Sequence, residues 1–244
     1  MTMHAGRTLC ALAAFAIGAT LTTSANAFIF WTDTGDGVGN RSGMNMDFTG
    51  GGSDFGLFGD PTVVGGNTLV FFPSSFRAES SDGTPGDEND RLEVTIIAHA
   101  GFKIDQIQIS EFGDYAINGG GEVSVTGTMF VTDLINTLPG PFPLPRVETD
   151  DLVSSPGSPI TSAGTTSGSW TATAGIDLTS TGGPDWTMVK LVLNNNLFAL
   201  SDAGGNSFIE KKVAGTGIAI TVIPTPGAGA LLAIGGLAFV RRRR

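Results

Sequence analysis

The sequence predicts an all-β protein built as an antiparallel β-sandwich. Glycine accounts for 36 of 244 residues, which is roughly twice its usual share, and charged residues make up only 15 % of the chain. Several segments alternate apolar and polar side chains with a period of two, which places the apolar ones on one face of a strand. Strands with one apolar face bury it by forming sheets that pack together. We therefore expect a sandwich of the jelly-roll type.

The strands are predicted where the alternation is clearest, and the turns where glycine clusters. The clearest strands cover residues 92–96, 107–109, 123–131, 189–193 and 218–222. Glycine pairs at 65–66, 119–120 and 182–183 mark turns, because glycine adopts the backbone conformations that tight turns require. No longer segment has the apolar period of a helix.

Residues 138–169 differ from the rest of the body because they are rich in Pro, Ser, Thr and Gly. This composition predicts either a long loop within one sandwich or a linker between two β subdomains. Each half of a divided body would hold few strands. We therefore favour one β-sandwich domain over residues 28–222, with an excursion at 138–169.

A corner is predicted at residues 111–115, Glu-Phe-Gly-Asp-Tyr, after a strand that begins near Phe102. Gly113 would supply a positive φ at this corner. Tyr115 would pack its ring while its hydroxyl bonds the backbone. We interpret the corner as architecture and not as a binding surface.

The N-terminus has the three parts of a secretory signal peptide over residues 1–27. A short basic stretch with Arg7 precedes the apolar residues 8–21, and the small residues Ala25 and Ala27 form the site that signal peptidase recognises. We expect a signal helix here, with cleavage after Ala27 on export. Cys10, the single cysteine, lies inside this segment. The mature chain would then have no thiol for a disulfide, a nucleophile or a cysteine-bound zinc.

The C-terminal residues 223–244 form a tail of three parts. The first is Pro224, Thr225, Pro226 and Gly227, where the prolines favour an extended peptide. The apolar run at 227–240 follows, and as a helix it would rise about 21 Å, short of the roughly 30 Å of hydrocarbon in a bilayer. The third part is a cationic cluster that should stay cytoplasmic, made of Arg241, Arg242, Arg243 and Arg244. We expect a short membrane helix that inserts transiently, with the body outside.

This tail resembles the PEP-CTERM sorting signal, which has a Pro-x-Pro motif, a Gly/Ala/Leu-rich membrane segment and terminal arginines in the same order. Thr225 stands where the commonest motif has Glu, and Pro-Thr-Pro-Gly looks like a variant of that motif. The resemblance covers the tail and the signal peptide. It implies that a membrane exosortase recognises and processes the tail. It also implies a location in the cell envelope, at the cell surface or in the extracellular matrix, linked to exopolysaccharide.

The body is strongly acidic. All 23 acidic residues lie between Asp33 and Glu210, against 8 basic residues within 28–222. A surface of this sign repels nucleic acid and tolerates divalent cations, so we expect no nucleic-acid partner. Calcium is the ion that would fit best, because it binds several oxygens in a pliable loop. Two Asp- and Gly-rich segments are candidates, although tight turns use the same residues; their carboxylates are Asp33 and Asp36 in the first and Asp82, Asp87 and Asp90 in the second.

No catalytic centre is predicted. His99 is the single histidine of the mature chain, so it can form no multi-histidine metal site, and no Gly-x-Ser-x-Gly elbow accompanies it. Two carboxylates could still serve a glycosidase, and the candidates are Glu79, Glu93, Glu111 and Asp114. Trp31 and Trp170 could stack on sugar rings, whereas Trp186, at the start of an alternating strand, is expected in the core.

Three functions follow from these features. We favour a non-enzymatic structural or adhesive role for an exported surface or matrix protein. The alternative is a calcium-dependent carbohydrate-binding module in the same matrix, and a secreted glycoside hydrolase is the less favoured third. No cofactor other than calcium is expected. The partners would be signal peptidase, exosortase and extracellular polysaccharide.

Overall fold

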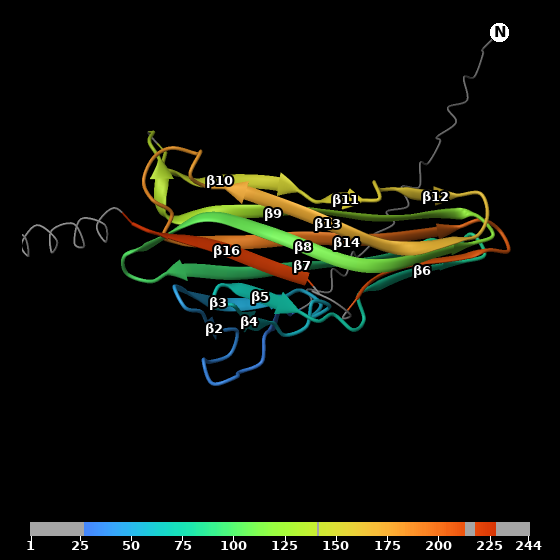
Figure 1. The fold of residues 1–244 in the computed structure, drawn as a ribbon, viewed down its shortest axis with the longest axis horizontal. Coiled ribbons are helices and arrows are strands. Elements are labelled where there is room, and N and C mark those ends of the chain that lie inside the picture. The colour runs from blue at the N-terminus through green and yellow to red at the C-terminus, as the bar shows by residue number, and fades with distance from the viewer. Residues whose placement is uncertain (1–26, 141, 213–217, 228–244) are drawn as a thin grey trace, which may run out of the picture.

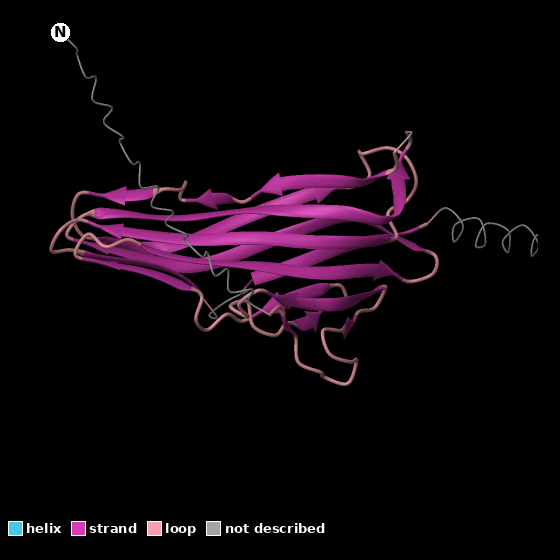
Figure 2. Ribbon diagram, turned by 180° about the vertical axis from the view of Figure 1, so that it is seen from behind, coloured by secondary structure: helices cyan, strands magenta, loops and turns pink. Residues whose placement is uncertain are grey.

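The computed structural model describes residues 27–140, 142–212 and 218–227. In this part of the chain the protein is all-β, and its strands form two antiparallel sheets (Figures 1 and 2). The all-β prediction is confirmed. The predicted signal helix and membrane helix fall on residues 1–26 and 228–244, which lie outside the described residues. Within the described ranges, no helix has the length and apolar character needed to cross a membrane.

The first sheet has the order β1-β3-β7-β14-β9-β10, with β2 paired to β3 and β12 paired to β9. Its strands are β1 Ile29–Phe30, β2 Arg41–Ser42, β3 Met46–Ser53, β7 Gly86–Ala98, β9 Gly121–Leu138, β10 Leu144–Asp151, β12 Ile160–Ser162 and β14 Met188–Ser201.

The second sheet has the order β11-β13-β8-β16-β5-β4, and β15 pairs with both β6 and β8. Its strands are β4 Thr62–Val64, β5 Thr68–Phe71, β6 Arg77–Ser81, β8 Phe102–Asn118, β11 Val153–Ser155, β13 Thr166–Asp177, β15 Asn206–Lys211 and β16 Ile218–Pro226.

The inner faces of the two sheets form one hydrophobic core. On β14, Leu191 is fully buried and lies between Val94 of β7 and Val131 of β9, which are also fully buried. Burying such a side chain contributes about 1.5–3 kcal/mol, so strands whose apolar residues alternate gain most by facing inward together. The strands predicted at 92–96, 107–109, 123–131, 189–193 and 218–222 are confirmed as parts of β7, β8, β9, β14 and β16.

Strand β8 organises the second sheet. It pairs with β13 along one edge, and along the other edge it pairs with β16 in its first half and with β15 in its second half. The corner predicted at 111–115 is wrong, because these residues continue β8. Gly113 is required for close approach and not for a positive φ. A Cβ at Gly113 would lie 2.0 Å from the Glu210 carbonyl oxygen and 2.5 Å from the Trp170 ring.

Residues 138–169 do not form the long loop or linker that their composition predicts. They contribute β10, β11, β12 and the start of β13. Strands β10 and β12 pair with β9 in the first sheet, whereas β11 pairs with β13 in the second. The segment therefore runs along both sheets of one sandwich. Its described prolines fall in the short connections or, for Pro145, beside a register shift, where a proline disrupts no regular ladder.

Candidate functional site

The predicted sorting motif is the end of the last strand. Pro224, Thr225 and Pro226 lie opposite Ile104, Lys103 and Phe102 of β8, and the Gly227 amide donates to the Gly101 carbonyl at 2.8 Å. The motif is extended, as its prolines predict. The predicted boundary at residue 222 is wrong, however, because β16 continues through the motif to Pro226 instead of leaving the sandwich at Ile223.

Both prolines are tolerated here because this stretch of β16 is an edge. On its far side β16 pairs with β5 from Ile218 to Thr221, and the Val222 amide donates to the Asn67 carbonyl; beyond Val222, no described strand pairs with this side. The Gly227 amide points toward β8, and successive residues of a strand point their amides to opposite sides. The Thr225 amide therefore points toward β8 as well. The ring nitrogens of Pro224 and Pro226 point toward the open edge, where the missing amide hydrogen costs no hydrogen bond of the ladder.

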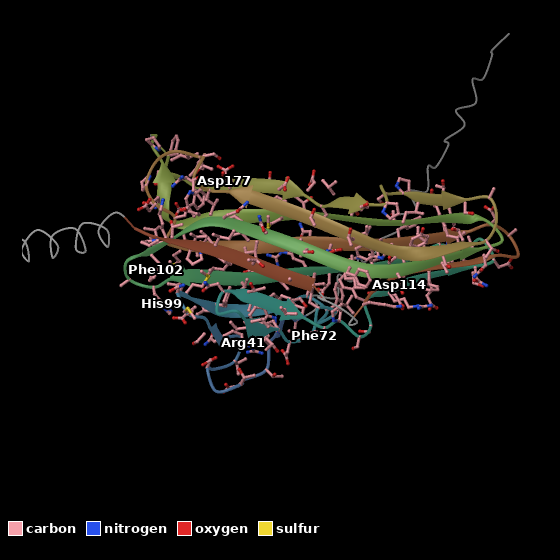
Figure 3. The ribbon with its side chains drawn as sticks, viewed as in Figure 1. Arg41, Phe72, His99, Phe102, Asp114 and Asp177 are labelled. Carbon is pink, nitrogen blue, oxygen red and sulfur yellow. The ribbon has the colours of Figure 1, made fainter. Side chains whose placement is uncertain are left out.

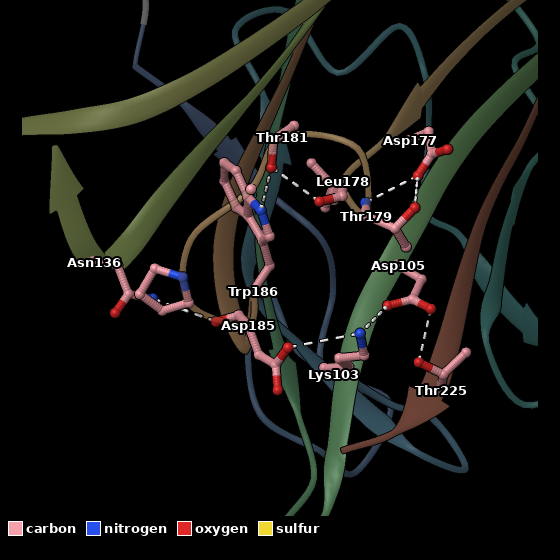
Figure 4. A network of polar contacts seen from close by, with 12 residues as sticks. Lys103, Asp105, Asn136, Asp177, Leu178, Thr179, Thr181, Asp185, Trp186 and Thr225 are labelled. Atoms are coloured by element: carbon pink, nitrogen blue, oxygen red, sulfur yellow. Dashed lines mark hydrogen bonds and ion pairs between the residues drawn. The ribbon is translucent and has the colours of Figure 1, made fainter. Parts of the chain in front are cut away.

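A chain of polar contacts holds Thr225 to the neighbouring loop (Figure 4). The Thr225 hydroxyl donates to Asp105 at 2.8 Å. Lys103 lies 3.1 Å from the other Asp105 oxygen and 3.6 Å from Asp185, and its hydrogen bond to Asp105 raises the pKa of Lys103. Lys103 and Asp105 are only partly buried, so solvent still screens this pair, and it contributes on the order of 1 kcal/mol. The motif is thus held in place weakly compared with a buried strand.

Arg146 anchors the loop at 178–187 that borders the motif. It is the residue that the register shift in β10 turns inward, and it is only 6 % exposed. Its guanidinium lies 4.2 Å from the centroid of the Trp186 ring. It donates to Asp133 Oδ2 at 3.1 Å, Thr181 Oγ1 at 3.0 Å, Pro184 O at 2.9 Å and Gly182 O at 2.6 Å.

A polar groove of about 590 Å³ lies over β7, β14 and β9. Asn194 lies opposite Arg91 on one side and Thr128 on the other, and the next outward residue of β14, Asn196, lies between Asn89 and Thr126. These amides and hydroxyls offer donors and acceptors to a polar ligand. No aromatic ring lines the groove within the described residues.

The first candidate calcium segment forms a self-contained turn. Asp33 accepts hydrogen bonds from the amides of Gly35 at 2.7 Å and Gly37 at 2.9 Å, and these bonds lower the pKa of Asp33. Asp36 accepts from the Ser42 amide at 3.2 Å. This is the ordinary use of Asp in a turn.

The second candidate segment is not one loop. Asp82 lies in the turn before β7 and accepts from the Gly204 amide at 2.8 Å, whereas Asp87 and Asp90 belong to β7 itself. Asp90 is buried and accepts from the Ser53 hydroxyl and from the amides of residues 55 and 57. Among the described residues, no group of at least three His, Cys, Asp or Glu side chains could hold a metal.

The candidate catalytic carboxylates each contact a basic side chain. Their partners are Arg77 for Glu79, Arg91 and Lys190 for Glu93, Lys211 for Glu111, and Lys212 for Asp114. His99 lies at the β7–β8 turn near Phe102, whereas Asp114 lies far along β8 (Figure 3). The His99 ring is 3.2 Å from Asp47. The structure does not bring these candidates together as one catalytic group.

All three tryptophans lie in the core. Trp186 is 2 % exposed, as predicted. Trp31 and Trp170, the candidates for stacking on sugars, are equally buried, so neither ring offers a face to a ligand.

A buried polar cluster, not predicted from the sequence, lies between the sheets. It consists of Glu111 on β8, Asn195 on β14 and Lys211 on β15, which contact one another through the Glu111 carboxylate. A signal was present in the phase of the alternation. Asn195 lies on the same face of its strand as Leu193 and Leu197, and Lys211 lies on the same face as Ile209. Both polar residues therefore occupy positions that should face the core.

No protein-family model matches the chain, and no curated protein is similar enough to count as a relative.

Proposed function

We propose that the protein is exported, processed at its tail by a membrane exosortase, and retained as a non-enzymatic structural or adhesive component of the cell surface or extracellular matrix. The observation that carries this proposal is the order of the three tail parts: Pro-Thr-Pro-Gly, an apolar run and four arginines. The predicted signal peptide supports export. The acidic body, free of cysteine after Cys10, suits a secreted matrix component.

The location of the motif at a strand end is compatible with processing. A protease binds its substrate as an extended peptide, and β16 already holds residues 224–226 extended along an open edge. The enzyme would still have to detach these residues from β8. The side-chain contacts at Thr225 add little to the free energy of that detachment, which falls at the end of a strand, where local opening is easiest.

The proposal is tested by fractionating producing cells with and without the exosortase and determining the C-terminus of the protein by mass spectrometry. We expect a chain shortened at or near residues 224–227 in wild-type cells, and a chain that keeps its arginines in cells without the enzyme. An intact tail in wild-type cells, or a protein found in the cytosol, would exclude the sorting role.

The Asp105→Ala variant, which removes the acceptor of the Thr225 hydroxyl, tests whether this contact limits the rate of processing. We expect faster conversion to the processed form, because the end of β16 detaches more often. The matched control is Asp177→Ala, because Asp177 is an exposed residue of β13 whose carboxylate accepts from residues 179 and 180 of the β13–β14 loop. Equal processing rates in the two variants would show that the Asp105 contact does not limit access.

A second candidate, the calcium-dependent carbohydrate-binding module, gains support from the groove beside Asn194 and Asn196. Exopolysaccharide from the producing cells should then retard the protein in affinity electrophoresis, and Asn194→Ala with Asn196→Ala should abolish the retardation. Unchanged mobility of the wild-type protein, with and without calcium, would exclude this role. The hydrolase gains no support, because each candidate carboxylate contacts a base.

The jelly-roll arrangement and the two terminal helices are also proposals. A jelly-roll arrangement is supported by the way β7, β8 and β9 alternate between the two sheets. The signal helix and the membrane helix rest on the hydropathy of residues outside the described ranges.

A further inference from the structure

Three polar side chains meet in the centre of the apolar core. The side chains of Lys211 and Glu111 are both 0 % exposed, and Asn195 is 3 % exposed. Asn195 comes from the first sheet, whereas Glu111 and Lys211 come from the second. Burying an amine and a carboxylate together is costly, and replacing such a pair with apolar residues is often neutral or stabilising. A reaction between these groups therefore explains the cluster better than a contribution to the free energy of folding.

One carboxylate connects the amine to the amide. Glu111 Oε2 accepts from Lys211 Nζ at 2.5 Å, and Glu111 Oε1 accepts from Asn195 Nδ2 at 2.5 Å. The nucleophile, the group that could move its proton and the side-chain amide are thus held together without solvent. In the described part of the chain, the buried Asn195 Oδ1 has no hydrogen-bond partner, which is rare for a buried polar atom.

The surroundings of Lys211 favour the uncharged amine. Its Nζ lies 4.9 Å from the ring centroid of Phe76 and 5.7 Å from those of Phe58 and Trp170. Burial lowers the pKa of Lys211, and the nearby Glu111 opposes this shift only in part. An amine without its extra proton has a lone pair and can act as a nucleophile. Proton transfer from Lys211 to Glu111 would also remove both charges from the apolar interior.

From this geometry we propose that Lys211 and Asn195 form an intramolecular isopeptide bond, with Glu111 as the general acid–base. Glu111 takes a proton from Lys211 Nζ, and the nitrogen lone pair attacks Asn195 Cγ. Glu111 then delivers this proton to the departing Nδ2 and takes one of the two protons that remain on Nζ after the attack. The Cγ–Nδ2 bond breaks, ammonia leaves, and Glu111 ends protonated. The product is a secondary amide between Nζ and Cγ. Nothing is oxidised or reduced, and no co-reactant is needed.

The bond would join the two sheets of a protein whose described residues contain no cysteine. Asn195 lies on β14, at the centre of the first sheet, and Lys211 ends β15 in the second. Because one carboxylate holds both the amine and the amide, the reaction is intramolecular, and the entropy cost of bringing the two groups together has already been met by folding. The proposal is independent of the tail, because the cross-link would form in the folded body with or without exosortase.

The test is peptide mapping of the folded, full-length protein. A protease that cuts at Asp202 or Glu210 separates Asn195 from Lys211 in the chain, so a cross-link yields one species in which the two peptides are joined and one ammonia is missing. We expect this species to predominate in the wild-type protein. Separate peptides of full mass would overturn the proposal. Loss of ammonia from an unlinked Asn195 peptide would indicate a succinimide and would overturn it equally.

Variants then assign the roles. Glu111→Gln should slow the linkage by roughly 10²–10⁴-fold, the usual contribution of a general acid–base, and Lys211→Met should abolish it. Lys212→Met is the matched control, because Lys212 contacts Asp114 and lies partly exposed; it should link as the wild type does. Far-UV circular dichroism checks that each variant is folded. If one is not, the wild-type peptide map alone decides whether the bond exists. Linkage of folded Glu111→Gln at the wild-type rate would exclude Glu111 as the acid–base.

Discussion

Replacing Arg146 by alanine is expected to lower the free energy of unfolding by about 3–5 kcal/mol, the cost of breaking a buried ion pair by removing one partner. The substitution removes the donors to Asp133 and to the loop at 178–187. It also leaves the Asp133 side chain, which is 0 % exposed, without its counter-charge. Guanidinium denaturation followed by circular dichroism measures the change.

The control for this prediction is Arg91→Ala. Arg91 also contacts two carboxylates, those of Asp54 and Glu93, but its side chain is 40 % exposed. Water and salt screen such pairs, so we expect a loss of at most about 1 kcal/mol. If Arg146→Ala were no more destabilising than Arg91→Ala, the loop would not depend on the buried guanidinium.

Replacing Gly113 by alanine is expected to destabilise the sandwich by about 2–3 kcal/mol, within the usual cost of overpacking a core. The new Cβ would lie 2.0 Å from the Glu210 carbonyl oxygen. Backbone must move to relieve that contact, because the atom belongs to the adjacent strand β15. The Trp170 ring, at 2.5 Å, would have to shift as well. Thermal unfolding measures the effect as a lower melting temperature.

Gly175→Ala provides the comparison, since Gly175 lies on the neighbouring strand β13. A Cβ there meets only the Gln108 side chain, at 3.7 Å, which is ordinary contact. Alanine should be neutral or slightly stabilising at this position, because it restricts the unfolded chain more than glycine does. A similar melting temperature for the two variants would contradict the close packing at Gly113.

The sequence predicted the strands well where one face is buried. At 189–193 the apolar residues Val189, Leu191 and Leu193 recur at every second position, and these are the positions that β14 buries. The alternation is a local property, so it is visible in a single segment. Partner strands are not visible in this way: β14 lies between β7 and β9, and no local pattern specifies that choice.

The sequence could not predict the features that depend on distant contacts. Gly113 was expected to have a positive φ, but its role is set by Glu210 and Trp170. The end of β16 was expected to lie outside the fold, because it begins the tail at 223–244. Pairing with residues 102–104 makes it an edge strand instead. Residues 138–169 have the composition of a loop, and their short strands depend on pairing with β9 and β13.

The pairing of the motif with β8 would give the proposed cleavage at the motif a second consequence. A chain that ended at Ile223 would lose the strand residues that lie opposite 102–104. The Gly101 carbonyl, which accepts from the Gly227 amide, and the backbone of Lys103, which lies opposite Thr225, would then lose their partners at one end of the sandwich. Such a bare edge can accept a strand from another molecule. Removing the anchor would thus also uncover a place where neighbouring copies can join by backbone hydrogen bonds.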